Sequence, residues 1–189
     1  DDARYRWPVK FEERTDNRKA TVREMAAHEI DRDDHRGVAG KTFVDLDGDI
    51  AILTSGGGAT MTLMDALIGY GGKPANYTEY SGNPPQEKVE ALTRIVLQKE
   101  GLKGLLVAGV VANFTNIYET LQGVLNVLIE LKPKFPILIR RVGVDWEKAR
   151  DAMMKAKEEH GLDIHYFDDK TPLTETAKKM VELAYGNTN

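Results

Sequence analysis

The stretch LLVAGVVANFTNIYETLQG, residues 105–123, begins as a buried strand and ends as a helix. Its aliphatic run is typical of a strand that is covered on both faces, as in parallel sheets. Between the two elements lie Asn113, Phe114, Thr115 and Asn116, which crowd amide, hydroxyl and backbone N–H donors at one strand end. Donors gathered at such a junction either cap the helix or bind a ligand.

The same unit of strand and helix repeats along the chain. We expect strands near residues 49–54, 75–80, 104–109, 136–140 and 163–167. We expect helices near residues 59–70, 85–99, 115–131, 145–159 and 172–185. Because each helix follows its strand within a few residues, the strands should be parallel and joined by right-handed crossovers. The predicted fold is α/β, a flavodoxin-like, doubly wound, five-stranded parallel sheet of order 2-1-3-4-5.

Residues 1–40 are rich in charge and poor in aliphatic side chains, so we expect an arm or linker there. Within it, TVREMAAHEI predicts a helix, because Thr21 and Glu24 have the spacing of a capping box. The segments KTFVDL and DIAILT then flank an Asp-Gly turn, which predicts a hairpin strand. The regular domain is therefore expected over residues 41–189.

The composition excludes several classes of protein. With 41% apolar and 30% charged residues and no apolar run long enough to cross a bilayer, the chain resembles a soluble globular domain and not a membrane protein. A net charge of −4 gives no basic surface for nucleic acid. The absence of cysteine excludes disulfides, thiol catalysis and thiolate metal sites. The N-terminal sequence has no targeting signal, so a cytoplasmic location is expected.

The predicted strand order places a crevice at the carboxyl ends of the first and third strands. The loop after the first strand carries Gly56, Gly57 and Gly58, and the loop after the third is the ANFTN segment. Glycines let a backbone approach a ligand closely, and the helix behind them offers unpaired N–H groups and a positive dipole end. Asn113 or Thr115 is expected to cap the second helix. Two helix N-termini would then face one anion site.

The fourth strand ends in Arg140 and Arg141, and an arginine can hold a carboxylate or phosphate with two parallel hydrogen bonds. Strand alternation lets only one of the two face a given side. Plainer interpretations stay open for each feature: a tight turn for the glycines, simple caps for the polar residues, a solvated pair for the arginines. Neither the histidines nor the aspartates have metal-ligand spacing, so no metal site is expected.

Other doubly wound families fit less well. A dinucleotide fingerprint would need glycine where Met61 stands, and Glu79 matches its acidic residue only loosely. The chain contains no Walker-type phosphate loop. A phosphoreceiver would need acids where this chain has glycines and amides.

The sequence GDIAILTSGGGATMTLMDALIGYGGKPANYTEYSGNPPQEKV resembles the C-terminal, ligase-type domain of succinyl-CoA synthetase β subunits. The motifs ANYTEYSG, ANFTN and LIRRVG are more similar to the citrate-binding domain of the ATP-citrate lyase and citryl-CoA synthetase family. This likeness runs from about Asp47 to the C-terminus. Residues 1–40 resemble only the exit from a preceding ATP-grasp domain.

The resemblance implies roles for particular residues. It implies that Gly57, Gly58, Asn113, Phe114 and Thr115 hold citrate and that Arg141 grips a carboxylate. It implies that the helix start at Gly58, Ala59 and Thr60 faces a phosphohistidine and stabilises an anion. It implies no catalytic residue and no cofactor for this domain alone, while ATP, Mg and CoA are used by the full enzyme.

The resemblance also implies partners, namely ATP-grasp and CoA-binding, phosphohistidine-bearing domains or subunits in a hetero-oligomer. No Gly-His-Ala-Gly segment and no ATP-grasp domain occur here, so the isolated chain should be inactive. The parent would be a lyase (acyltransferase) or a synthetase (acid-thiol ligase). A succinate- or malate-type CoA ligase domain and a non-catalytic nucleotide-binding or interface module remain as alternatives.

Overall fold

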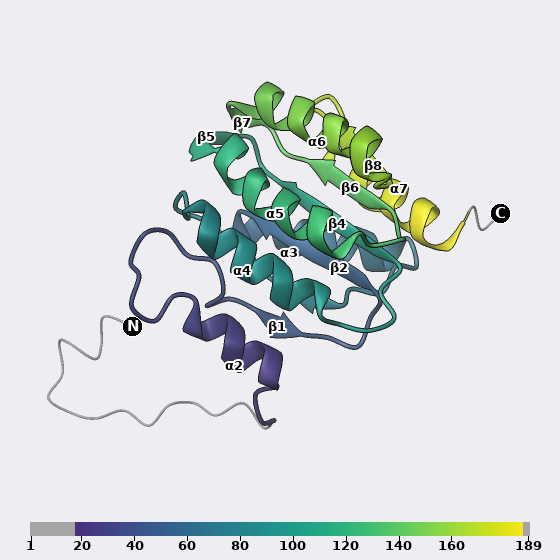
Figure 1. Cartoon of the computed structure of the whole chain (residues 1–189). Helices are drawn as coiled ribbons and strands as arrows, with labels where there is room; N and C mark the ends of the chain where they lie inside the picture. Colours follow the sequence, from purple (N-terminus) through teal and green to yellow (C-terminus); the bar gives the residue numbers. More distant parts are fainter. Residues whose placement is uncertain (1–17, 187–189) are drawn as a thin grey trace, which may run out of the picture.

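A four-stranded parallel sheet forms the centre of the structure, a computed structural model that describes residues 18–186 (Figure 1). Its strands, in spatial order, are β2 (Ile50–Ser55), β4 (Gly104–Gly109), β6 (Ile137–Arg140) and β8 (Ile164–Phe167). Every residue of β2, β4 and β6 is buried, as expected for strands whose sequences are continuous apolar runs. The predicted α/β class and the parallel pairing are confirmed.

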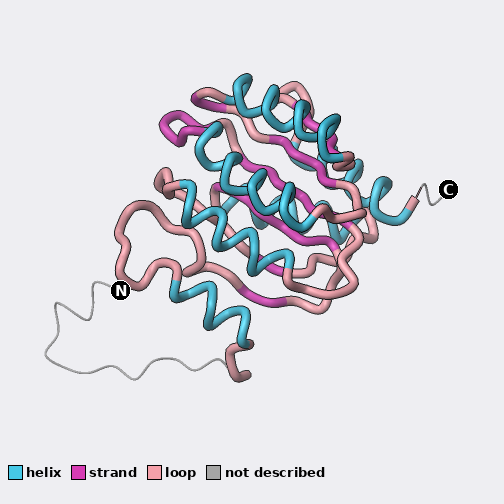
Figure 2. Tube along the Cα trace, in the orientation of Figure 1, coloured by secondary structure: helices cyan, strands magenta, loops and turns pink. Residues whose placement is uncertain are grey.

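Helices cover both faces of this sheet. Figure 1 shows helices in front of the sheet and behind it, and Figure 2 shows the same layers by element type. The front layer consists of α4 (Gln86–Leu97), α5 (Ile117–Leu131) and α6 (Trp146–His160), and the rear layer consists of α3 (Gly57–Gly69) and α7 (Leu173–Tyr185). Alternate residues of each strand face opposite layers, so Val107 packs in the front core and Leu106 in the rear core. All five expected helices are present, and the doubly wound arrangement is confirmed.

The expected second strand, residues 75–80, is wrong as a strand of this sheet. Only β3 (Asn76–Tyr77) is regular there, and the segment meets β2 through isolated parallel bridges, Ile50 with Pro74 and Thr54 with Glu79. Between these bridges the Asn76 side chain accepts a hydrogen bond from Ile52 N at 3.0 Å and donates one to Ile52 O at 2.8 Å. The side-chain amide of Asn76 thus makes the two hydrogen bonds that a neighbouring strand's backbone would otherwise make with Ile52. The segment lies beside β2 as predicted, but a five-stranded order is not formed.

The expected hairpin is also wrong. The strand β1 (Val44–Asp45) pairs in the antiparallel sense with β3 and not with β2. The Asp-Gly turn does not fold β1 back onto β2, because the backbone there bonds the chain around Lys73: Gly48 N donates to Pro74 O at 3.1 Å and Asp49 N to Lys73 O at 2.9 Å.

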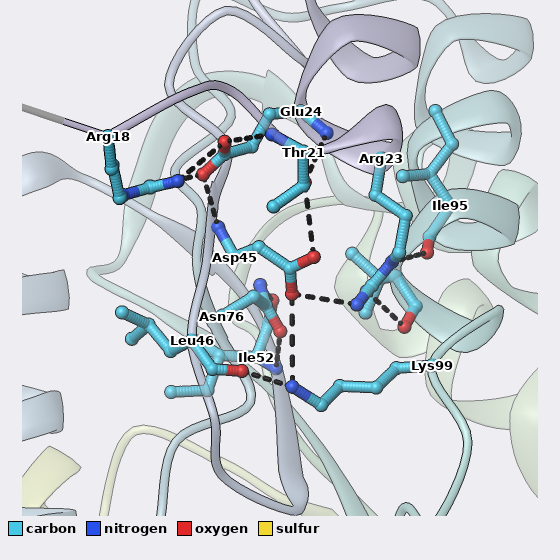
Figure 3. A network of polar contacts seen from close by, with 11 residues as sticks. Arg18, Thr21, Arg23, Glu24, Asp45, Leu46, Ile52, Asn76, Ile95 and Lys99 are labelled. Carbon is cyan, nitrogen blue, oxygen red and sulfur yellow. Dashed lines mark hydrogen bonds and ion pairs between the residues drawn. The ribbon is translucent and has the colours of Figure 1, made fainter. Parts of the chain in front are cut away.

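The helix α2 (Val22–Glu29) begins with the predicted capping box, in which Thr21 and Glu24 each accept a hydrogen bond from the other's backbone N–H. Figure 3 shows the polar network that ties α2 to the sheet edge. Glu24 is buried and accepts from Arg18 and from Asp45 N, and Asp45 in turn pairs with Arg23 at 2.8 Å. The hydrogen bonds from Arg18 lower the pKa of Glu24 to about 2. Residues 1–17 of the expected arm lie outside the described residues.

Candidate functional site

Three segments meet at the carboxyl edge of the sheet. Ser55, the last residue of β2, pairs with Gly109, the last residue of β4, and Ala108 pairs with Arg140 at the end of β6. Three segments therefore begin next to one another, at the ends of neighbouring strands: the glycine turn after β2, the ANFTN segment after β4 and the arginine pair at the end of β6. The structure therefore brings the beginnings of these three segments to one edge, where Gly56 lies beside Val110 and Gly109 beside Arg141.

The helix α3 begins at Gly57, two residues before the predicted start. Gly57 and Gly58 are exposed, and no neighbouring atom lies within 4 Å of where a side chain would begin at either position. The first N–H groups of a helix lack intrahelical acceptors, so this open end can donate to an anion. Ala59 is half-buried.

Thr60 is committed to the protein. Its N–H and its hydroxyl both donate to Gly56 O, at 2.9 and 3.0 Å, and its hydroxyl also lies 2.7 Å from that of Thr54. The Gly56 N–H is likewise occupied, because it donates to the Glu79 carboxylate at 3.1 Å. The N–H groups offered by this helix end are consequently those of Gly57, Gly58 and Ala59.

The ANFTN segment is a strand and not a loop. It forms β5 (Ala112–Asn116), which pairs in parallel with β7 (Gly143–Val144) in a separate two-stranded sheet. Asn113 and Phe114 are exposed, Phe114 by 71%, whereas Thr115 is buried. Strand alternation alone does not account for this pattern, because Asn113 and Thr115 lie on the same face of the strand and only Thr115 is buried.

The expectation that Asn113 or Thr115 caps α5 is wrong. Asn116 is the N-cap, and its side-chain oxygen accepts from Glu119 N at 3.1 Å. The same residue joins two further loops, because its backbone N–H donates to Asn83 Oδ1 at 2.9 Å and its side-chain nitrogen to Asp145 Oδ2 at 3.1 Å. Asn113 and Thr115 are thereby left without a capping role.

The two arginines at the end of β6 have different environments. The Arg140 guanidinium donates to three backbone carbonyls: Gly109 O at 2.8 Å, Thr171 O at 3.1 Å and Asp169 O at 3.4 Å. Burial lowers the pKa of Arg140, and the nearby Asp169 carboxylate opposes that shift. Arg140 therefore fastens the loop before α7 to the end of β4, and its donors are already in use.

Arg141 is fully buried, and none of its guanidinium nitrogens has a hydrogen-bond partner within residues 18–186. The guanidinium lies 5.6 Å from the centre of the Tyr80 ring, and the Arg141 carbonyl accepts from the Tyr166 hydroxyl at 2.7 Å. Burial raises the pKa of Tyr166 above its usual range, so that hydroxyl stays a neutral donor. A buried charge without an acceptor is costly, and an anion bound beside it would supply the missing acceptor.

Three residues that contact the glycine turn or Arg141 were not among the predicted site residues. Glu79, considered only as a dinucleotide acid, bonds the glycine turn. Tyr80 is fully buried beside the guanidinium, and Gly109 leaves the space that Arg141 Nη1 occupies. The EYSG motif contains two of these residues, and period-two alternation would have placed Tyr80 inside.

No group of three or more His, Asp or Glu side chains in the described part of the chain could hold a metal ion. Among the described helices, none combines the length and the apolar character needed to span a bilayer.

Comparison with known proteins links this geometry to one family. A family model described as ATP citrate lyase citrate-binding matches residues 18–183. The ADP-forming succinate–CoA ligase β subunit of Desulfurococcus amylolyticus is 30% identical over 169 residues, which cover 89% of this chain and 40% of that protein. The corresponding subunit of Staphylothermus marinus is 34% identical over 145 residues, covering 77% of this chain and 36% of that protein.

Two solved structures share the fold over 98% of this chain. A mutant ATP citrate lyase from Methanosaeta concilii in complex with (3S)-citryl-CoA has a TM-score of 0.80 and 27% identity, and 49% of it is covered. ATP citrate lyase from Methanothrix soehngenii in complex with citrate and coenzyme A has a TM-score of 0.79 and 26% identity, with 52% covered. The chain spans about two fifths of the curated relatives and about half of these solved chains. By the match over residues 18–183, the chain belongs to the ATP citrate lyase citrate-binding family.

Proposed function

We propose that this chain is the citrate-binding domain of an ATP-dependent citrate lyase or citryl-CoA synthetase. The observation that carries the proposal is Arg141, a buried guanidinium whose hydrogen-bond donors have no acceptor within residues 18–186. A carboxylate placed there would receive two parallel, charge-assisted hydrogen bonds. Citrate has three carboxylates, so two of them remain for other hydrogen-bond donors at the same edge of the sheet.

In this proposal, the other carboxylates and the hydroxyl of citrate meet neutral donors. In the proposed complex these donors are the N–H groups of Gly57 and Gly58, the amide of Asn113, the Thr115 hydroxyl and the backbone of Phe114; Gly57, Gly58 and Asn113 are exposed residues. Because the Arg141 guanidinium has no exposed surface, citrate must displace atoms that now cover it. The edge therefore opens locally when citrate binds.

The chemistry proposed for the whole enzyme needs positioning and anion stabilisation from this domain, and no general base. ATP, with Mg, phosphorylates a histidine of a partner domain. The phosphorus–nitrogen bond then breaks as a citrate carboxylate takes the phosphoryl group. The N-terminus of α3, at Gly58, Ala59 and Thr60, faces the transferring phosphoryl group in this arrangement, although the Thr60 N–H itself is committed to Gly56 O. Finally, CoA attacks the carbonyl carbon of citryl phosphate, forming the thioester and expelling phosphate.

The partners in this proposal are citrate and the ATP-grasp and CoA-binding, phosphohistidine-bearing domains or subunits of a cytoplasmic hetero-oligomer. Residues 1–40 lead from the ATP-grasp region, and residues 41–189 form the citrate-binding domain. The isolated chain then binds substrate but turns nothing over.

Calorimetric titration of the 189-residue chain with citrate tests the proposal. The wild type should bind citrate, and Arg141→Ala should weaken binding by about 1.5–3 kcal/mol, the range for a charge-assisted hydrogen bond. Arg150→Ala is the matched control, because Arg150 is an exposed arginine of α6 that pairs with Asp151. An unchanged citrate affinity in Arg141→Ala would remove this arginine from the site.

A succinate- or malate-type CoA ligase domain is the second candidate, because the curated relatives are succinate–CoA ligase β subunits. Titrations with citrate, succinate and malate separate the two. Tighter binding of a dicarboxylate would favour this candidate, since only a tricarboxylate requires the amide segment and the arginine together.

A further inference from the structure

We infer that Tyr80 is a positioning residue for Arg141: its ring holds the guanidinium in place without occupying any of its hydrogen-bond donors. This inference rests on the proposed function, because it concerns how the site receives a carboxylate. The observation behind it is the position of the guanidinium 5.6 Å from the centre of the Tyr80 ring.

A buried guanidinium usually has a carboxylate partner, which both holds it and uses its donors. Within residues 18–186, Arg141 forms no salt bridge and its guanidinium nitrogens form no hydrogen bond. An aromatic face attracts the cation electrostatically and leaves the N–H groups, which lie in the guanidinium plane, available. The ring thus supplies the attraction that a carboxylate would supply, but not its hydrogen bonds.

Tyr80 is itself held rigidly enough for this role. The residue is fully buried, and its backbone N–H donates to Thr54 O at 2.9 Å, which fixes it beside the end of β2. Its hydroxyl has no hydrogen-bond partner within the described residues. The ring and the hydroxyl are therefore two separable candidates for the contribution of this side chain.

A second arginine in the same chain provides a contrast. Arg23 lies 5.3 Å from the centre of the Phe43 ring, but its guanidinium also donates to Asp45 and to the carbonyls of Ile95 and Val96. That arginine is structural, and its donors are consumed by the fold. Arg141 has the ring contact alone, which is the arrangement expected for an arginine that is kept ready for a ligand.

The test compares citrate titrations of Tyr80→Phe and Tyr80→Leu in the 189-residue chain. Tyr80→Phe keeps the ring and should bind citrate within about twofold of wild type, whereas Tyr80→Leu should lose about tenfold or more. In the Arg141→Ala background, Tyr80→Leu should cause no further loss, because the two residues act through one contact. Phe43→Leu is the matched control, since it removes a different ring–arginine contact, that of Arg23, and should leave citrate affinity unchanged.

A phenylalanine carrying ring fluorines in place of Tyr80 covers the case in which Tyr80→Leu fails to fold. Fluorination weakens the negative face of the ring at nearly constant shape, so citrate affinity should fall stepwise with fluorine number. A merely structural role of the ring would not produce this trend.

Three outcomes would overturn the inference: wild-type affinity in Tyr80→Leu, an equal loss in Tyr80→Phe and Tyr80→Leu, or no dependence on ring fluorination. The second of these would assign the hydroxyl as a direct contact instead. Failure of the proposed function is distinguishable, because wild type itself would then not bind citrate.

Discussion

The Nη1 atom of Arg141 occupies the position in which a side chain on Gly109 would begin. The strand β4 ends in a residue without a side chain, and the guanidinium from the neighbouring strand uses that space. Ser55 O also lies 2.8 Å from the point at which that side chain would begin. Gly109 is therefore a steric requirement of the arginine that carries the proposed function.

Gly109→Ala should displace the Arg141 guanidinium and weaken citrate binding by about tenfold or more, and overpacking should destabilise the fold by about 1–3 kcal/mol. Calorimetric titration and denaturant unfolding measure the two effects. Gly69→Ala is the control, because Gly69 lies in α3 with open space where its side chain would begin. Wild-type citrate affinity in Gly109→Ala would show that the arginine can bind from another position.

Substitution of the two neighbouring arginines by methionine should change stability in opposite directions. Arg140→Met removes charge-assisted hydrogen bonds to Gly109 O and Thr171 O and should destabilise the chain by about 1.5–3 kcal/mol. Arg141→Met removes a buried charge that has no acceptor in the described residues, and should stabilise the chain by about 1–3 kcal/mol while citrate binding weakens. Denaturant titrations check both signs, and a destabilised Arg141→Met would mean that attraction to the Tyr80 ring outweighs the cost of burying the charge.

Lys88→Met should destabilise the chain by about 3–5 kcal/mol, because it leaves the Asp31 carboxylate buried and unpaired. The Lys88 ammonium lies 2.6 Å from Asp31 Oδ1, with both side chains almost fully buried, and it also donates to the carbonyls of Asp34 and Gly37. Lys155→Met, which removes an exposed pair with Glu159, should change the unfolding free energy by less than about 0.5 kcal/mol. Similar losses of unfolding free energy in Lys88→Met and Lys155→Met would show that the buried pair contributes no more stability than an exposed one.

Acid should weaken the attachment of α2 through Glu24. The pKa of Glu24 is lowered from 4.5 to about 2 in the folded chain, chiefly by hydrogen bonds from Arg18. A depressed folded-state pKa gives stability that is fully present above the unfolded pKa and is lost as the pH falls. The difference in unfolding free energy between wild type and Glu24→Gln should therefore shrink by about 1–2 kcal/mol from pH 5 to pH 2, allowing for solvent around Arg18. Chemical unfolding of both proteins from pH 2 to pH 5 measures this difference in unfolding free energy. A difference that does not change with pH would show that ionisation of Glu24 does not stabilise the fold.

Much of the fold follows from patterns within single segments. The strands β4 and β6 are aliphatic runs bounded by loops, and α5 and α7 have helical periodicity, so sequence placed them close to their observed bounds. Segment 75–80 alternates like a strand, but its pairing depends on where the Asn76 amide lies, which is a tertiary property. The hairpin prediction was wrong for a similar reason, because β1 bonds a segment distant in the chain.

The candidate site was predictable to the level of residue type and motif. Alternation predicted that only one of Arg140 and Arg141 could face a given side, and the motif resemblance indicated Arg141. The partners that distinguish the two arginines come from separate elements: carbonyls before α7 for Arg140, and a ring beside β2 for Arg141. No local pattern encodes such contacts, so the roles of Gly109 and Tyr80 were not predicted.

The Asn76 side chain also protects the rim of the central sheet against templated aggregation. On the side of β2 away from β4, Ile50 and Thr54 form backbone hydrogen bonds with residues 73–80. Between them, the Asn76 amide forms hydrogen bonds with both the N–H and the carbonyl of Ile52. A strand with all these groups occupied offers no ladder to a foreign chain. The amide thus occupies the one position along this edge of β2 that the bridges at Ile50 and Thr54 leave open to cross-molecular pairing.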